Sequence, residues 1–120
     1  MTATDIANRY ITTWNETDSQ RRSALLREGW TDGATYVDPL AGAAGYAEIG
    51  KLIESVQQRF PGFRFSLASR VDHYGDRVRF SWSFGPDGQG DLIQGTDFCE
   101  IEGGRLKAVT GFLDKVPPGN

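Results

Sequence analysis

The sequence predicts an α+β fold, in which helices come first and antiparallel strands follow. Before Pro61 the apolar residues recur mainly at helical spacing, with one short strand at 34–38. After Pro61 apolar and polar residues alternate, and glycine-containing turns such as Gly75-Asp76 and Gly103-Gly104 separate the strands. Helices early and strands late favour a layer of helices on one face of a curved sheet.

Composition limits the classes of protein to consider. The 120 residues suit one domain over 1–120, and 38% hydrophobic residues can form a core. The net charge is -3 and no basic stripe is present, so we expect no nucleic-acid partner. No apolar run approaches the roughly 18 residues of a membrane span, and the N-terminus lacks a secretory signal.

The single Cys99 suits a cytoplasmic protein, and one Cys with one His predicts no metal cluster.

Three helices are expected. Thr4 and Asp5 can cap the first, where Ile6, Tyr10 and Trp14 share one face. The second covers 20–30, with inward Ala24, Leu25, Leu26 and Trp30 and outward Arg21, Arg22 and Arg27. The third covers 46–60, where an apolar stripe ends at Pro61-Gly62.

Four long strands should follow the short strand at 34–38. They cover 63–73, 77–84, 91–102 and 105–113, and we expect them to pair as an antiparallel meander. The loop 39–45 consists mostly of small residues, so we expect it to be mobile and to line or cover an opening.

Asp38 is the first candidate functional residue. Alternate side chains of a strand share a face, so Tyr36 and Asp38 should point the same way. A carboxylate at a strand end beside an aromatic ring suits the mouth of a pocket. The alternative is that Asp38 only caps the turn that Pro39 enforces.

Asp97 is the second candidate. It should share a strand face with Ile93, Gly95, Cys99 and Ile101, where an isolated carboxylate would have a raised pKa. The alternative is a structural aspartate with a partner such as Arg79. Cys99 on the same face is interpreted as a small buried hydrophobe. His73 could act as a base, but a surface histidine beside a turn is the simpler interpretation.

Four short segments carry a resemblance to a known family: RYITTWN in the first helix, ATYVDP in the short strand, AGYAEI before the third helix, and GTDFCEIEGGRLKAVTGF in the late strands. Their order resembles the nuclear transport factor 2-like superfamily, and within it the SnoaL-like polyketide cyclases and the ketosteroid isomerases. The resemblance implies a cone, in which a strongly curved, mostly antiparallel sheet wraps around three N-terminal helices. Because GTDF is more similar to SnoaL-like members, steroid specificity is not implied.

The resemblance to the isomerases also implies roles for three residues. Tyr10 matches a hydrogen-bond-donating tyrosine, Asp38 a general base, and Asp97 a neutral carboxylic acid that donates to an oxyanion. Aromatic side chains would form the wall of the ligand pocket: Trp14, Tyr36, Phe65, Phe80, Trp82 and Phe112.

Two functions remain open from the sequence. The first is a cofactor-free enzyme that performs general acid/base chemistry, of isomerase, cyclase, hydratase or hydrolase type, on a small, mainly apolar molecule. The second is a non-catalytic module for small-ligand binding or dimerisation. In either case we expect a homodimer through the open sheet face, with Phe98 and Leu113 as candidate contacts.

Overall fold

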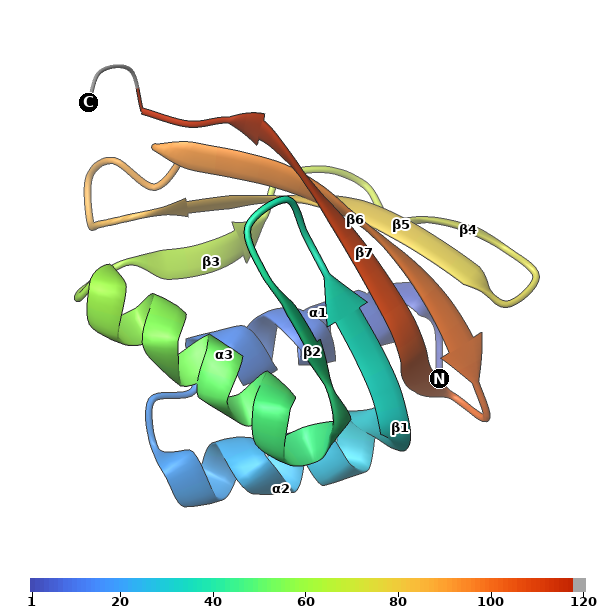
Figure 1. The fold of residues 1–120 in the computed structure, drawn as a ribbon. Helices are drawn as coiled ribbons and strands as arrows, with labels where there is room; N and C mark the ends of the chain where they lie inside the picture. The colour runs from blue at the N-terminus through green and yellow to red at the C-terminus, as the bar shows by residue number, and fades with distance from the viewer. Residues whose placement is uncertain (118–120) are drawn as a thin grey trace.

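The computed structural model describes residues 1–117, which form three helices and seven strands. The helices are α1 (Ala3–Asn15), α2 (Ser19–Gly29) and α3 (Gly45–Arg59). The strands are β1 (Trp30–Val37), β2 (Gly42–Ala44), β3 (Arg64–Leu67), β4 (Asp72–Tyr74), β5 (Arg77–Gly85), β6 (Ile93–Glu102) and β7 (Arg105–Lys115). All three helices lie below an open, curved sheet, as the α+β prediction requires (Figure 1).

The sheet has the strand order β2-β1-β7-β6-β5-β3, and β4 also pairs with β5. Strand β1 runs parallel to β7, with Val37 opposite Thr110, and the other pairs are antiparallel. The first long strand of the chain therefore lies beside the last (Figure 1). This pairing places the carboxyl end of β1, and Asp38 just after it, next to the middle of β7.

Three parts of the sheet differ from the sequence prediction. The short strand expected over 34–38 is the eight-residue β1, which begins at Trp30, a residue expected to end the second helix. The strand expected over 63–73 is two short strands, β3 and β4, because residues 68–71 leave the ladder. The loop expected over 39–45 contains β2, which pairs with β1 through Tyr36 and Ala43. Backbone pairing therefore holds this segment, although Leu40 still lines the opening beneath it, as expected.

The cap of α1 lies two residues before the expected one. The Thr2 hydroxyl accepts from the Asp5 N–H at 3.0 Å, and the Asp5 carboxylate accepts from the Thr2 N–H at 3.0 Å. This reciprocal arrangement is a capping box, which satisfies two backbone donors at the helix start. In α2, Asp18 is the N-cap, and its carboxylate accepts from the Arg21 N–H at 2.9 Å.

The outward orientation predicted for Arg22 is wrong. Its side chain is buried, and it donates to the Glu16 carbonyl at 2.9 Å and to Gln57 Oε1 at 3.2 Å. The guanidinium thus satisfies a carbonyl left free where α1 ends and links that end to α3. Ala24, expected to face inward, is exposed instead.

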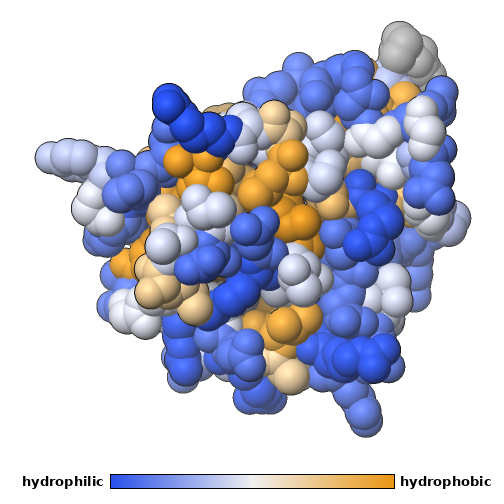
Figure 2. Space-filling view, turned by 180° about the vertical axis from the view of Figure 1, so that it is seen from behind, coloured by the Kyte–Doolittle hydropathy of each residue, from blue (hydrophilic) through white to orange (hydrophobic). Residues whose placement is uncertain are grey.

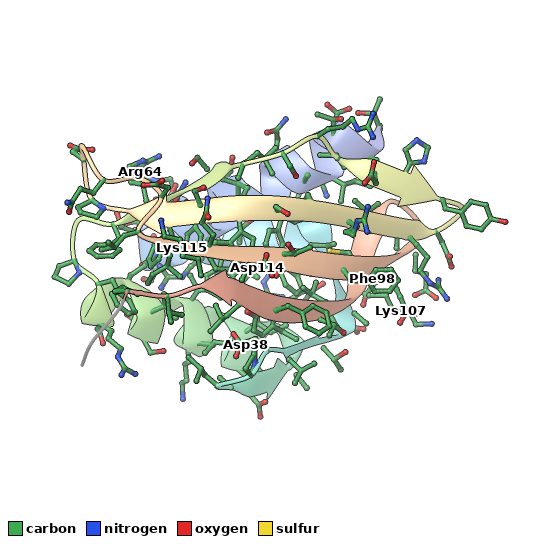
Figure 3. All side chains as sticks on the ribbon, turned by 90° about the horizontal axis from the view of Figure 1, so that it is seen from above. Asp38, Arg64, Phe98, Lys107, Asp114 and Lys115 are labelled. Carbon is green, nitrogen blue, oxygen red and sulfur yellow. The ribbon has the colours of Figure 1, made fainter. Side chains whose placement is uncertain are left out.

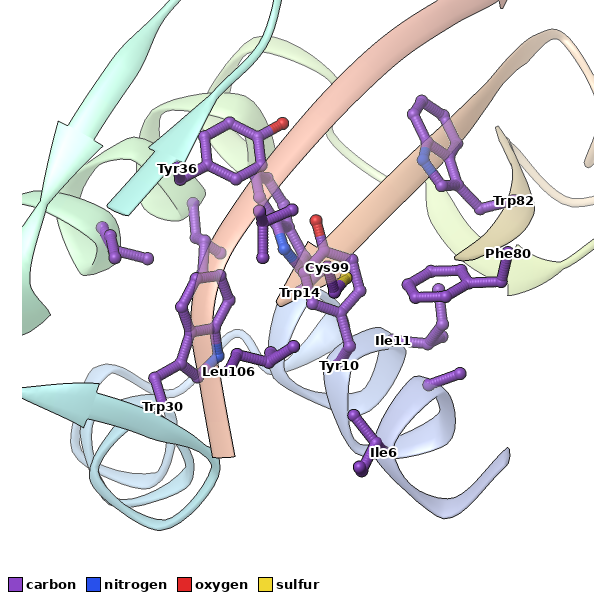
Figure 4. Packing of buried hydrophobic residues seen from close by; sticks show 14 of the residues in the cluster. Ile6, Tyr10, Ile11, Trp14, Trp30, Tyr36, Phe80, Trp82, Cys99 and Leu106 are labelled. Carbon is purple, nitrogen blue, oxygen red and sulfur yellow. The ribbon is translucent and has the colours of Figure 1, made fainter. Parts of the chain in front are cut away.

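The core lies between the helices and the inner face of the sheet, and aromatic rings make up much of it (Figure 4). The Tyr10 ring stacks on Trp30 at a centroid distance of 5.7 Å and meets the edge of Phe80 at 5.3 Å. From behind, the surface shows separate apolar patches among hydrophilic residues (Figure 2). Across residues 1–117, none of the helices combines the length and apolar character needed to cross a bilayer.

Candidate active site

A cavity of about 260 Å³ opens between the helices and the inner face of the sheet. Most of its wall is aliphatic or aromatic, and its polar side chains are two tyrosines and two aspartates, with tryptophan indoles among the rings. The residues that line it are Tyr10, Trp14, Tyr36, Asp38, Leu40, Val56, Phe60, Phe65, Trp82, Phe84, Ile93, Asp97, Gly111, Phe112, Leu113, Val116 and Pro117. All three residues of the predicted polar trio therefore reach one cavity.

Helix α1 places Tyr10 and Trp14 one turn apart, so both reach the cavity. Tyr10 is buried, and its pKa is raised well above the usual value by burial and then by the nearby Asp97. Its hydroxyl therefore keeps its proton and is a hydrogen-bond donor. Figure 4 shows the hydroxyls of Tyr10 and Tyr36 directed into the region between those rings and Trp82.

Asp38 follows the end of β1 and is half-buried. Its Oδ1 accepts from the backbone N–H groups of Leu40 and Ala41, each at 2.8 Å. Its Oδ2 accepts from the Tyr36 hydroxyl at 2.7 Å. One oxygen of Asp38 thus caps the turn, as the alternative interpretation expects, and the other lies among the polar groups of the cavity, where a functional role stays a prediction.

Asp97 on β6 is almost completely buried, at 2% exposure. Within residues 1–117 its Oδ1 has no hydrogen-bond partner. Burial raises the pKa of Asp97 to about 6, an effect that Tyr10 and Trp82 partly offset and that the charge of Asp38 reinforces. The partner suggested from the sequence, Arg79, instead pairs with Asp72 at 2.6 Å.

Gly111 on β7 marks the point where these groups converge. A methyl group on this residue would lie 2.8 Å from Asp97 Oδ1, 3.4 Å from Asp38 Cβ and 3.5 Å from the Tyr36 hydroxyl. The two aspartates and Tyr36 therefore border one small space, which is open because residue 111 has no side chain. The sequence analysis missed Gly111, although its position opposite Asp97 in the β6–β7 pair could have indicated it.

The structure separates the predicted wall residues into three groups. Four line the cavity and are mostly buried: Trp14, Tyr36, Phe65 and Trp82. Phe112 also borders it, but its side chain is 55% exposed. Phe80 is buried in the core against Tyr10 and is not among the lining residues of the described chain.

The sequence analysis missed several wall residues, and it placed one on the wrong face. Phe84 stacks on Phe65 at a centroid distance of 3.9 Å and lines the cavity, as do Phe60 and Val56 of α3. Leu113, expected on the open sheet face, also lines the cavity. The physical reason is alternation along β7, which turns Val109, Gly111 and Leu113 inward and Phe112 outward.

The other reactive side chains lie away from this cavity. His73 on β4 is exposed. Cys99 is buried, and burial raises the pKa of its thiol. In the described part of the chain, no group of three or more His, Cys, Asp or Glu side chains is arranged to hold a metal ion.

Three helices beneath an open, curved sheet define a fold class that this chain shares with solved structures described as nuclear transport factor 2-like. Within that class the chain belongs to the SnoaL-like family, because the model of the SnoaL-like domain matches residues 7–109. A comparison with curated proteins gives no match.

Three solved structures illustrate the relationship. A candidate isomerase of the SnoaL-like family from Agrobacterium tumefaciens is 40% identical, with a TM-score of 0.90 over 95% of this chain and 99% of that one. A candidate ketosteroid isomerase from Kribbella flavida is 20% identical, with a TM-score of 0.71 over 98% and 83%. A candidate polyketide cyclase from Sinorhizobium meliloti is 17% identical, with a TM-score of 0.71 over 92% and 99%. The latter two similarities concern the fold alone.

Proposed function

We propose that this protein is an enzyme that moves a proton on a small, mainly apolar carbonyl compound, without a cofactor. The observation that carries the proposal is the convergence at Gly111, where Asp38, Asp97 and the Tyr36 hydroxyl border one space in an apolar cavity. Tyr10 lines the same cavity and interacts with Asp97. Apolar pockets with a few converging polar groups are typical of small-molecule sites.

In the proposed mechanism, Asp38 is the general base. Its Oδ2 takes a proton from the carbon next to the substrate carbonyl. The C–H electron pair forms a new C=C bond, and the π pair of the C=O bond moves onto the carbonyl oxygen. Tyr10 and protonated Asp97 donate hydrogen bonds to that oxygen as negative charge develops. In a β,γ-unsaturated ketone, the electron pair on oxygen re-forms the C=O bond, the α,β C=C bond remains, and the pair of the original C=C bond takes the proton from Asp38 at the γ-carbon. The product is the conjugated isomer and the enzyme is unchanged.

The charges of the cavity indicate an uncharged substrate. Among residues 1–117, the side chains that line the cavity include two aspartates but no Lys, Arg or His. A carboxylate or phosphate ester would meet negative charge in a site that excludes water, which is unfavourable. The aromatic wall would instead hold a hydrocarbon body, and the carbonyl would be its polar end.

The relatives support this class of reaction. The Agrobacterium tumefaciens protein is described as a candidate isomerase of the same family, and it is the most similar of the three compared here.

The test is the isomerisation of 3-cyclohexen-1-one to the conjugated 2-cyclohexen-1-one, followed by ultraviolet absorbance. Asp38→Asn should lower turnover about 10²–10⁴-fold, because the amide cannot accept the proton. The fold should survive, since Asn keeps an oxygen for the N–H groups of Leu40 and Ala41. Circular dichroism and the melting temperature provide the control.

The alternative is a module that binds a small ligand without changing it. Wild-type protein that binds the ketone but does not isomerise it would favour that alternative. Activity unchanged in Asp38→Asn would remove Asp38 from the mechanism. Trp14 and Trp82 line the cavity without filling it, so it can hold a small molecule under either function.

A further inference from the structure

We propose that Tyr36 is a positioning residue, which holds Asp38 Oδ2 in the orientation from which it removes the proton. The inference rests on the proposed function of Asp38 and extends it to a residue expected only to form part of the cavity wall. Tyr36 would act through Asp38 and need not touch the reacting atoms. Its hydroxyl donates to Oδ2 at 2.7 Å, a distance typical of a strong hydrogen bond to a carboxylate.

Each oxygen of Asp38 has a separate support. The turn after β1 holds Oδ1 through the N–H groups of Leu40 and Ala41, each at 2.8 Å. Tyr36 is the only side chain in residues 1–117 that donates to Oδ2. Without the hydroxyl, the turn would keep the carboxylate at the mouth of the cavity, but Oδ2 would face the apolar wall with no donor.

Tyr36 is itself held firmly. It shares a face of β1 with Asp38, and its backbone pairs with Ala43 on one side and Val109 on the other. The ring is 6% exposed and packs on Trp14 at a centroid distance of 5.5 Å. A ring fixed by a sheet and an indole is a rigid support, as precise catalytic geometry requires.

The hydroxyl is suited to donate at every working pH. Burial raises the pKa of Tyr36 strongly, and the negative charges of Asp97 and Asp38 raise it further. The phenol therefore keeps its one proton, which points at Asp38. Because the Tyr36 hydroxyl already donates its proton to Asp38, Tyr36 is not a second hydrogen-bond donor to the substrate. Tyr10 remains the tyrosine for that role.

The test compares Tyr36→Phe with the matched control Tyr46→Phe. Tyr46 also donates a hydroxyl hydrogen bond, to the Trp30 carbonyl at 2.8 Å, but it does not line the cavity. In Tyr36→Phe we expect kcat for 3-cyclohexen-1-one to fall about 10- to 100-fold with KM unchanged, since the wall keeps its ring. Tyr46→Phe should retain wild-type kcat.

A second measurement needs no activity. Protein labelled with ¹³C at aspartate carboxyl carbons is studied by NMR, and the Asp38 signal is identified by its loss in Asp38→Asn. Tyr36→Phe should shift this signal, and Tyr46→Phe should leave it in place.

The two measurements distinguish the failures. An unshifted Asp38 signal in Tyr36→Phe would overturn the positioning role, whether or not the enzyme turns over. A shifted signal with unchanged kcat would overturn it too. The third outcome is a shifted Asp38 signal in Tyr36→Phe together with a wild-type protein that never isomerises the ketone. It would show that Tyr36 holds Asp38, and it would reject the proposed function.

Discussion

At Asp97 a carboxyl group is almost completely buried, and one of its oxygens has no partner in residues 1–117. Ionising such a group costs free energy, which explains why its pKa rises to about 6. The proposed role needs the protonated form, because only that form can donate to an oxyanion. A carboxylic acid with this pKa loses its proton near neutral pH, so both charge states are accessible.

This burial predicts how stability depends on pH. The pKa of Asp97 is raised from 3.8 to about 6 on folding, so protonation stabilises the fold fully below pH 3.8. That stabilisation is lost as pH rises through about 6, and two pKa units correspond to about 3 kcal/mol. Relative to wild type, Asp97→Asn should therefore gain about 3 kcal/mol of unfolding free energy between pH 4 and pH 8.

Urea denaturation of both proteins at the two pH values measures this difference. Groups far from Asp97 titrate equally in wild type and variant, so their contributions to the free energy of unfolding cancel in the comparison. A stability difference that stays constant from pH 4 to pH 8 would show that Asp97 ionises normally in the folded protein.

The orientation of a single side chain could be predicted where its partners are near in the sequence, and not where they are distant. The shared side of Tyr36 and Asp38 follows from strand alternation, and their hydrogen bond agrees with it. The inward Asp97 was predicted in the same way and is buried. Arg22 could not be predicted, because its partners Glu16 and Gln57 become neighbours only when α2 packs between the end of α1 and α3.

At the scale of the elements, close packing between β5, β6 and β7 shapes the wall of the cavity. Trp82 on β5 lies over Gly95 on β6, directly across the strand pair. A methyl group on residue 95 would overlap the Trp82 indole and lie 2.6 Å from the Phe112 carbonyl oxygen. The glycine therefore lets the indole pack directly against the β6 backbone, where Trp82 forms part of the cavity wall.

Gly95→Ala should consequently destabilise the protein by about 1–3 kcal/mol, the usual range for overpacking. Gly33→Ala is the matched control, because a methyl group there meets no atom of the described chain within 4 Å. Chemical denaturation at one pH measures the free energy of unfolding of both variants. Equal stability of the two variants would show that the sheet relaxes around Trp82 without cost.

The elements themselves show which patterns sequence can resolve. The long strands β5, β6 and β7 follow from a period-two alternation over at least eight residues, and α3 follows from its apolar stripe. The break at 68–71 and the strand β2 involve too few residues for a periodic signal. The parallel pairing of β1 with β7 joins segments about 70 residues apart, which no local pattern encodes.

For the whole molecule, the outer face of the sheet points away from the helices. Phe98 lies on that face of β6 (Figure 3), is 39% exposed, and has Thr110 opposite it on β7. Val37 and Phe112 are also exposed, at 50% and 55%. Apolar side chains on an uncovered sheet face are typical of an interaction surface, so we propose a homodimer through this face.

Sedimentation equilibrium should give twice the 13.2 kDa mass of one chain. Phe98→Asp should shift the equilibrium toward monomer, because each of the two chains would place one negative charge in the contact. Ala24→Asp is the control, since Ala24 is exposed on α2, on the helical side of the molecule. A concentration-independent monomer in the wild-type protein would contradict the dimer.

The most direct test of the central claim is deuterium uptake by a simple ketone. Cyclohexanone in D₂O exchanges its α-protons only if a base removes them, so this measurement needs no product and no knowledge of the natural substrate. Proton NMR should show enzyme-dependent exchange with wild type and none above background with Asp38→Asn. Exchange at the same rate with both proteins, or no exchange above background with wild type, would contradict proton abstraction by Asp38 in this cavity.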